Sequence, residues 1–115
     1  MAAWSDVVAI GAALPEVEES TWYRTPALKV RGKAFCRMKE DGETLVVRVV
    51  DIDDKEALLQ SDPDALFTTP HYDGYPYVLV RLAAVRRGVL EELLEDAWRC
   101  MAPKRLLAER DEEAS

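Results

Sequence analysis

Apolar and polar side chains alternate along several stretches of the chain, which is typical of strands with one buried face. Segments 27–31 and 33–39 alternate on either side of Gly32, a residue that permits the positive φ of a tight turn. Segments 44–50 and 77–82 alternate too, the first directly after an Asp-Gly turn signal. We therefore predict a hairpin and two further strands, preceded by a short strand at 21–24. The predicted buried face comprises Leu28, Val30, Ala34, Cys36, Met38, Leu45, Val47, Val49, Val78, Val80 and Leu82.

Helical spacing marks other parts of the chain. Segment 89–101 carries an apolar stripe that includes Leu93, Leu94, Ala97 and Trp98, with acidic residues facing away. Segment 51–61 is predicted as a helix because Asp53 and Glu56 have capping-box spacing. A shorter helix is expected over 6–13, capped by Ser5, with an acidic solvated connector after it at 16–19. A last helical segment is expected at 104–109.

This order of elements predicts the α+β class, with an antiparallel sheet and helices packed on one face. The other face would then be left to solvent, as antiparallel sheets allow. A chain of 115 residues suits one domain, 1–115, and residues 110–115 are predicted to be a disordered tail.

Between the predicted helix at 51–61 and the last strand lies a loop rich in aromatic residues, His71-Tyr72-Asp73-Gly74-Tyr75-Pro76. Together with Asp96-Ala97-Trp98, Ala102-Pro103-Lys104 and the earlier Pro26-Ala27-Leu28-Lys29-Val30, this loop resembles the MmcQ/YjbR family. The resemblance extends from about residue 6 to about residue 107. It implies a fold like that of CyaY, the bacterial frataxin homologue, and DNA binding, a role attributed to the family largely by fold analogy. It supplies no catalytic motif.

Charge is unevenly distributed along the chain. The total of 15 Lys and Arg against 22 Asp and Glu gives a net charge of −7, which opposes tight nonspecific binding to nucleic acid. Between Arg24 and Lys39, however, six residues are basic and none is acidic. The strand phases put basic and aromatic residues together on the solvent face of the sheet: Lys29, Arg31, Lys33, Phe35, Arg37, Lys39, Arg48, Tyr77 and Arg81.

Three interpretations of that face stay open. Basic residues interleaved with aromatic ones suit phosphates and stacked bases, and this predicts nucleic-acid binding. The same charges could serve only to keep a bare sheet soluble. They could also bind an acidic protein partner, which would make the chain a protein-interaction module.

Other chemistry has less support. His71, the single histidine, stands beside Asp73, but no nucleophile is near in sequence, so we expect a non-catalytic protein. The acidic helices would permit frataxin-like metal binding, although such acidic runs are usually solvated helix faces. Cys36 and Cys100 are predicted to be reduced, and no metal or cofactor is expected. With no signal peptide or apolar run of membrane length, a cytoplasmic protein is the default expectation.

Overall fold

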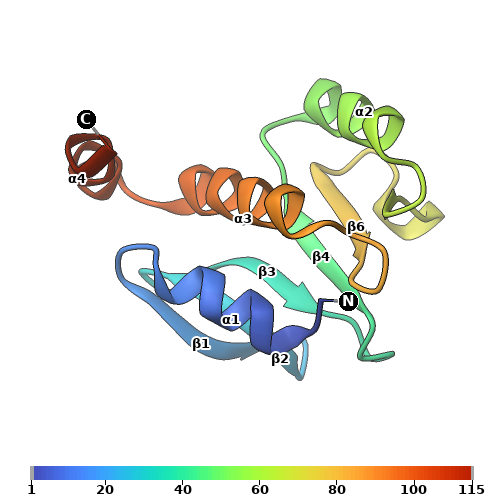
Figure 1. Ribbon diagram of the computed structural model, residues 1–115, viewed down its shortest axis with the longest axis horizontal. Helices are drawn as coiled ribbons and strands as arrows, with labels where there is room; N and C mark the ends of the chain where they lie inside the picture. The colour runs from blue at the N-terminus through green and yellow to red at the C-terminus, as the bar shows by residue number, and fades with distance from the viewer. Residues whose placement is uncertain (1, 115) are drawn as a thin grey trace.

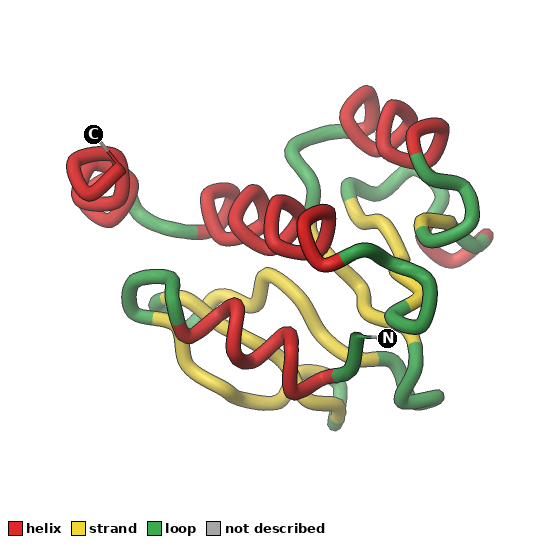
Figure 2. Tube along the Cα trace, viewed as in Figure 1, coloured by secondary structure: helices red, strands yellow, loops and turns green. Residues whose placement is uncertain are grey.

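A computed structural model describes residues 2–114 and consists of one antiparallel sheet with four α-helices packed against it (Figure 1). The strands lie in the order β1-β2-β3-β4-β6-β5. Figure 2 shows the first helix and the long helix 87–101 lying across the sheet, and the C-terminal helix beyond the end of the strands. The elements are α1 (Trp4–Ala12), β1 (Val17–Trp22), β2 (Thr25–Val30), β3 (Lys33–Met38), β4 (Thr44–Arg48), α2 (Ile52–Ser61), β5 (Leu66–Phe67), the 3₁₀ helix η1 (Pro70–Tyr72), β6 (Tyr77–Arg81), α3 (Arg87–Met101) and α4 (Lys104–Ala114).

The core lies between the sheet and the helices α1 and α3. Ten of the eleven strand residues predicted to face the core are buried in it, and Ala34 is the exception. They are buried together with Leu93, Leu94, Ala97 and Trp98. Trp98 is fully buried, and its indole Nε1 donates a hydrogen bond to the backbone oxygen of Pro15, 3.0 Å away. The predicted α+β class and its core are therefore confirmed. None of the helices in the described part of the chain is long and apolar enough to cross a membrane.

Phe35 is not on the solvent face, as the strand phase predicted, but fully buried in the core. The register between β2 and β3 explains this difference. Leu28 faces Cys36, whereas the next residue, Lys29, faces Ala34, so Phe35 is the extra residue of a β-bulge. A bulge shifts the alternation by one position, which turns Phe35 inward and places Ala34 on the face of Lys29.

The acidic segment predicted as a connector is instead the edge strand β1. Glu18 and Glu19 pair in register with Lys29 and Leu28 of β2. An edge strand needs few apolar side chains, and charged ones protect it from pairing with other chains. For this reason composition alone suggested a loop.

The helix ends also differ from the predicted ones. The first turn of α1 is closed by Asp6, whose carboxylate accepts from the Ala3 amide at 2.7 Å, rather than by Ser5. In α2 the cap is Asp51, which accepts from the Asp54 amide at 2.8 Å. Helix α4 extends to Ala114 and so includes most of the segment predicted as a tail, while Ser115 lies outside the described residues.

Glu95 on α3 holds α4 in place. Its carboxylate accepts from Arg110 at 2.8 Å and from Arg99 at 3.1 Å, and Arg99 also binds Asp111. Arg110, followed by Arg99, lowers the pKa of Glu95. The stabilisation from these ion pairs is therefore present at neutral pH and is lost as the pH falls through the lowered pKa.

Replacing the central tryptophan should be costly. We expect Trp98→Ala to reduce the free energy of unfolding by about 3–5 kcal/mol, because it empties a fully buried site. Urea unfolding monitored by circular dichroism measures this loss. Val50→Ala is the matched control at an exposed apolar position, and similar losses for both variants would contradict the assigned core.

The Glu95 ion pairs generate a pH prediction. Glu95→Gln should destabilise the protein at pH 7 but have a smaller effect at a pH below the lowered pKa of the wild-type carboxylate, where that group is protonated. Urea unfolding at both pH values tests this. Glu113→Gln, which removes only an exposed 3.9 Å pair with Arg110, is the control. An effect of Glu95→Gln that does not change with pH would show that the ion pairs contribute nothing.

Candidate functional site

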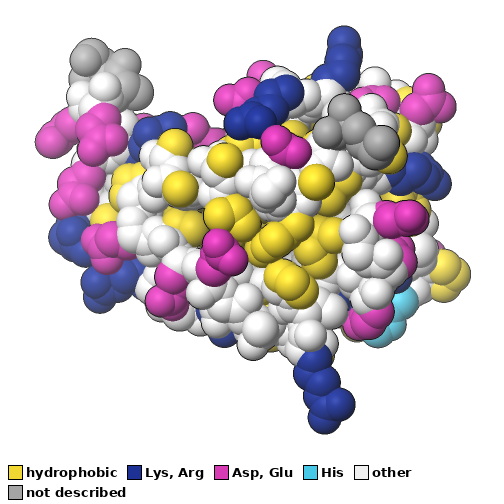
Figure 3. Space-filling model, turned by 60° about the horizontal axis from the view of Figure 1, so that its bottom comes forward, with side chains coloured by type: hydrophobic (Ala, Val, Ile, Leu, Met, Phe, Trp, Pro, Cys, Tyr) yellow, Lys and Arg dark blue, Asp and Glu magenta, His cyan; other side chains and the backbone are white. Residues whose placement is uncertain are grey.

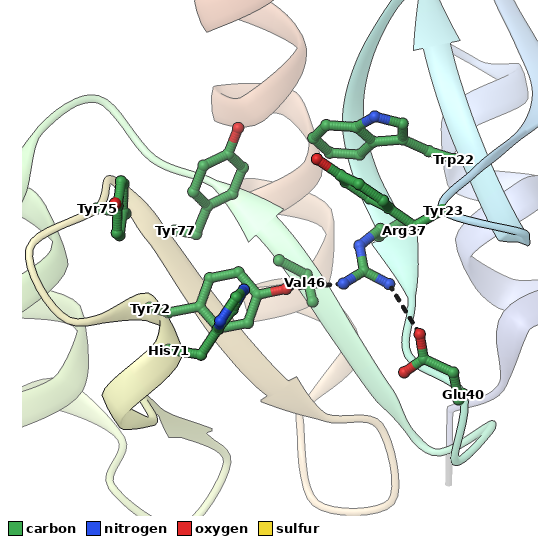
Figure 4. Close-up of a pocket in the computed structure, with 9 residues that line it drawn as sticks. All are labelled: Trp22, Tyr23, Arg37, Glu40, Val46, His71, Tyr72, Tyr75 and Tyr77. Atoms are coloured by element: carbon green, nitrogen blue, oxygen red, sulfur yellow. Dashed lines mark hydrogen bonds and ion pairs between the residues drawn. The ribbon is translucent and has the colours of Figure 1, made fainter.

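We had expected the second face of the sheet to be bare, but it is partly covered. Ala27, Val46 and Leu79 are buried on it, and Arg37 lies in register between Ala27 and Val46. A cleft of about 600 Å³ opens over this face between the β1–β2 turn and the loop at 70–76. We call it the aromatic cleft; Figure 4 shows its lining, which consists of Trp22, Tyr23, Arg37, Glu40, Val46, His71, Tyr72, Tyr75 and Tyr77.

Arg37 lies at the base of the aromatic cleft and is only 8 % exposed. Its Nη1 donates to the Thr25 hydroxyl at 3.3 Å and to the Met38 backbone oxygen at 3.2 Å. Its Nη2 donates to the Tyr72 hydroxyl at 2.8 Å. A buried charge needs such partners to offset its lost hydration. The guanidinium thus connects β2 and β3 to the loop and is largely occupied by the protein itself.

The loop has a second anchor, Lys55 of α2. Its ammonium donates to the backbone oxygens of Tyr72 at 2.6 Å and Tyr75 at 3.1 Å, and the residue is 4 % exposed. Burial lowers the pKa of Lys55, and the nearby charge of Asp73 partly opposes that shift. Gly74, with φ of +81°, makes the turn between the two tyrosines. The loop backbone is therefore held from below by α2 while its rings line the aromatic cleft.

The rings of the loop pack against one another. His71 meets Tyr72 edge-on with centroids 4.9 Å apart, and Tyr72 lies 6.2 Å from Tyr77. Several polar tips remain available: within residues 2–114, neither the hydroxyls of Tyr23, Tyr75 and Tyr77 nor the indole nitrogen of Trp22 has a hydrogen-bond partner. The aromatic cleft can therefore stack flat groups and also offer them donors and acceptors.

Acid–base chemistry by His71 and Asp73 has no geometric support in the described residues. No hydrogen bond joins the two side chains, and both are exposed. Among residues 2–114 no group of three or more His, Cys, Asp or Glu side chains could hold a metal ion. Cys36 and Cys100 are free thiols, and burial raises the pKa of Cys36 to about 12.

The basic residues predicted to share one surface are largely separated or engaged. Arg31 binds Glu16 at 3.2 Å, and Lys29 lies opposite Glu18. Lys33 is exposed beside the turn, opposite Val30, and Lys39 is half-buried. On the face drawn in Figure 3, Lys and Arg side chains are likewise interspersed with Asp and Glu.

Two further cations of the predicted set sit on aromatic rings. The Arg48 guanidinium lies 5.9 Å from the ring centre of Tyr77, a residue of the aromatic cleft. Arg81 stacks on Phe67 at 4.0 Å and donates to the backbone oxygen of Asp64, away from the residues that line the cleft. Of the predicted basic and aromatic set, Arg37, Arg48 and Tyr77 therefore lie together. They lie beside three residues of the predicted loop, His71, Tyr72 and Tyr75. The other loop residues, Asp73, Gly74 and Pro76, adjoin them in the chain.

Sequence reasoning missed Trp22, Tyr23, Glu40, Val46 and Lys55. The adjacent aromatic pair Trp22-Tyr23 was the available signal. The strand predicted at 21–24 lies instead at Val17–Trp22, so Tyr23 is in the turn after it and not within a strand. Lys55 had none, because a lysine in a polar helix ordinarily faces water.

A family model described as YjbR matches residues 12–100. Uncharacterised proteins of Mycobacterium tuberculosis and Mycobacterium bovis are 40 % identical over 93 % of the chain and 94 % of their own length. The crystal structure of the Deinococcus radiodurans protein DR2400, assigned to the domain family DUF419, has a TM-score of 0.70 at 23 % identity over 85 % of this chain and 77 % of that one. That likeness shows a shared fold.

The contact between Arg37 and Tyr72 can be tested by removing one hydroxyl. Tyr72→Phe leaves a buried charged donor without its acceptor, so we expect a loss of about 1–3 kcal/mol in the free energy of unfolding. Tyr75→Phe is the matched control, since its hydroxyl has no partner among the described residues and its removal should cost little. Equal effects of the two variants in urea unfolding would contradict the assigned role of Arg37.

Proposed function

The chain belongs to the YjbR family, and we propose that it is a non-catalytic binding protein that takes unpaired nucleobases of single-stranded nucleic acid into the aromatic cleft. The observation that carries this proposal is the convergence of five aromatic side chains and His71 on one open cleft. Stacking on such rings contributes about 1–3 kcal/mol per base and requires no particular base sequence.

The accessible polar groups fit the same kind of ligand. Tyr23 and Tyr75 are 68 % and 59 % exposed, so their rings can meet a base without displacing other side chains. Their hydroxyls and the indole N–H of Trp22 have no partner among residues 2–114 and can bond to base edges. Bases in a duplex are already stacked and paired, so duplex DNA should bind much more weakly than a single strand.

Phosphate contacts make a smaller contribution than the sequence suggested. Arg37 is buried, Arg31 is paired with Glu16, and the Arg48 guanidinium lies 5.9 Å from the ring centre of Tyr77. When few phosphates are neutralised, affinity depends only weakly on salt. On a single strand, the logarithm of the binding constant falls by about 0.7 per phosphate contacted for each tenfold rise in salt concentration. The net charge of −7 further reduces the electrostatic contribution to affinity, because it weakens attraction to a polyanion.

Protein recognition is the second candidate function. Exposed tyrosines beside a tryptophan and an arginine are also the composition of interface hot spots. The sequence-based form of this alternative, binding of an acidic partner, loses support because Glu16 pairs with Arg31 and Glu18 lies opposite Lys29 in the sheet. Frataxin-like metal binding has less support, because no group of three or more His, Cys, Asp or Glu side chains among residues 2–114 is placed to hold a metal ion.

Fluorescence anisotropy with a labelled oligothymidine of about 12 nucleotides, a length within the range of single-strand binding sites, tests the proposal. Tyr75→Ala should weaken binding about 5- to 150-fold, the equivalent of one lost stacking contact, while leaving the melting temperature nearly unchanged because the side chain is largely exposed. Lys33→Ala, at the opposite end of β3 from the aromatic cleft, is the control and should bind as the wild type does.

Two outcomes would contradict the proposal. Wild-type protein that does not bind the oligonucleotide at low salt would favour the protein-recognition function. Equal weakening by Tyr75→Ala and Lys33→Ala would remove the aromatic cleft from the binding surface.

A further inference from the structure

The β1–β2 turn has a backbone conformation that its residues rarely adopt. Tyr23 and Arg24 occupy its two central positions, between the paired residues Trp22 and Thr25, with φ values of +53° and +66°. Positive φ at both positions is the pattern of a type I′ turn, for which Asn-Gly is the favoured sequence. Side chains larger than asparagine are strained there, and such strain persists where the surrounding structure or a function maintains it.

The turn at the other end of β2 provides a comparison within the same chain. Arg31 and Gly32 also have positive φ, +52° and +81°, but there the second position is glycine. The β2–β3 turn thus has the favourable glycine at its second central position, whereas the β1–β2 turn has Arg24 there. The hairpin that omits it is the one that borders the aromatic cleft.

The strained turn exposes two side chains: that of Tyr23, which lines the aromatic cleft, and that of Arg24, the next residue in the chain. The Tyr23 ring lies 5.3 Å from the Arg37 guanidinium and 4.9 Å from the Trp22 ring, yet Tyr23 is 68 % exposed. One part of the ring is therefore covered by the protein while the rest faces solvent. Figure 4 shows the Tyr23 ring between Trp22 and Arg37. Arg24 is exposed and has no ion-pair or hydrogen-bond partner among residues 2–114.

We propose that Tyr23 and Arg24 form a second nucleotide subsite, so that the smallest ligand bound well contains two consecutive nucleotides. This inference rests on the proposed function. One base enters the aromatic cleft, the next stacks on the exposed part of Tyr23, and Arg24 binds the phosphate that joins them. A free mononucleotide would use only the first subsite. The protein would thereby select oligonucleotides over the free nucleotides that are abundant in any cell.

Binding titrations with thymidine monophosphate, a thymidine dinucleotide and a 12-nucleotide oligothymidine test this inference. For wild type we expect a large gain in affinity from the first ligand to the second. Tyr23→Asn combined with Arg24→Gly should reduce affinity for the two longer ligands at least 10-fold more than it reduces affinity for the mononucleotide, because Tyr23 also lines the aromatic cleft whereas Arg24 does not. Its melting temperature should be retained, because asparagine and glycine accept the turn conformation without strain. Arg31→Asn, which gives the other turn the same favourable pair, is the control and should not change binding.

Each remaining outcome overturns a defined part of the account. If wild type binds the 12-nucleotide ligand and the double variant binds it equally well, the second subsite is wrong and the proposed function stands. If wild type binds none of the three ligands, the proposed function fails and the subsite with it. If the double variant loses both melting temperature and affinity, the turn serves the fold, and the inference is overturned.

Discussion

The buried guanidinium of Arg37 is the constraint on which the second face of the sheet depends. A charge that is 8 % exposed must have its hydrogen bonds supplied by the protein. Those partners come from β2, β3 and the loop that carries Tyr72. Satisfying one side chain therefore fixes the loop at a set distance above the strands, and the space left between them is the aromatic cleft. The arginine shapes the site without being free to bind the ligand.

A second buried cation completes the arrangement from the opposite side. Lys55 binds two backbone oxygens of the same loop, so the turn at Gly74 is held by α2 while its rings face the cleft. Because Arg37 and Lys55 both anchor the loop, it loses little further conformational entropy when a ligand binds. Tyr75 and Tyr23 are among the exposed side chains of the site, and rigid aromatic side chains of this kind supply contact area at low entropic cost.

Much of the fold could be predicted from the sequence, because alternation of apolar residues reports directly on one buried face. The strands that contribute Leu45, Val47 and Val80 followed that rule. Phe35 did not, since a bulge shifts the phase of alternation and leaves no signal in composition. The site was harder to predict. Its loop was recognisable, but the role of Arg37 depends on burial of a residue type that usually faces water. Lys55 likewise acquires its function only through tertiary packing.

The central claim is that ligand recognition occurs at the rings of the aromatic cleft and not on a basic surface. NMR spectroscopy with isotope-labelled aromatic side chains, titrated with a 12-nucleotide oligothymidine, tests this most directly. We expect the ring signals of Tyr23, Tyr75 and Tyr77 to shift, whereas those of the buried rings of Phe35 and Trp98 stay unchanged. Unchanged tyrosine signals, with shifts confined to the backbone amides around Lys29 and Lys33, would contradict it.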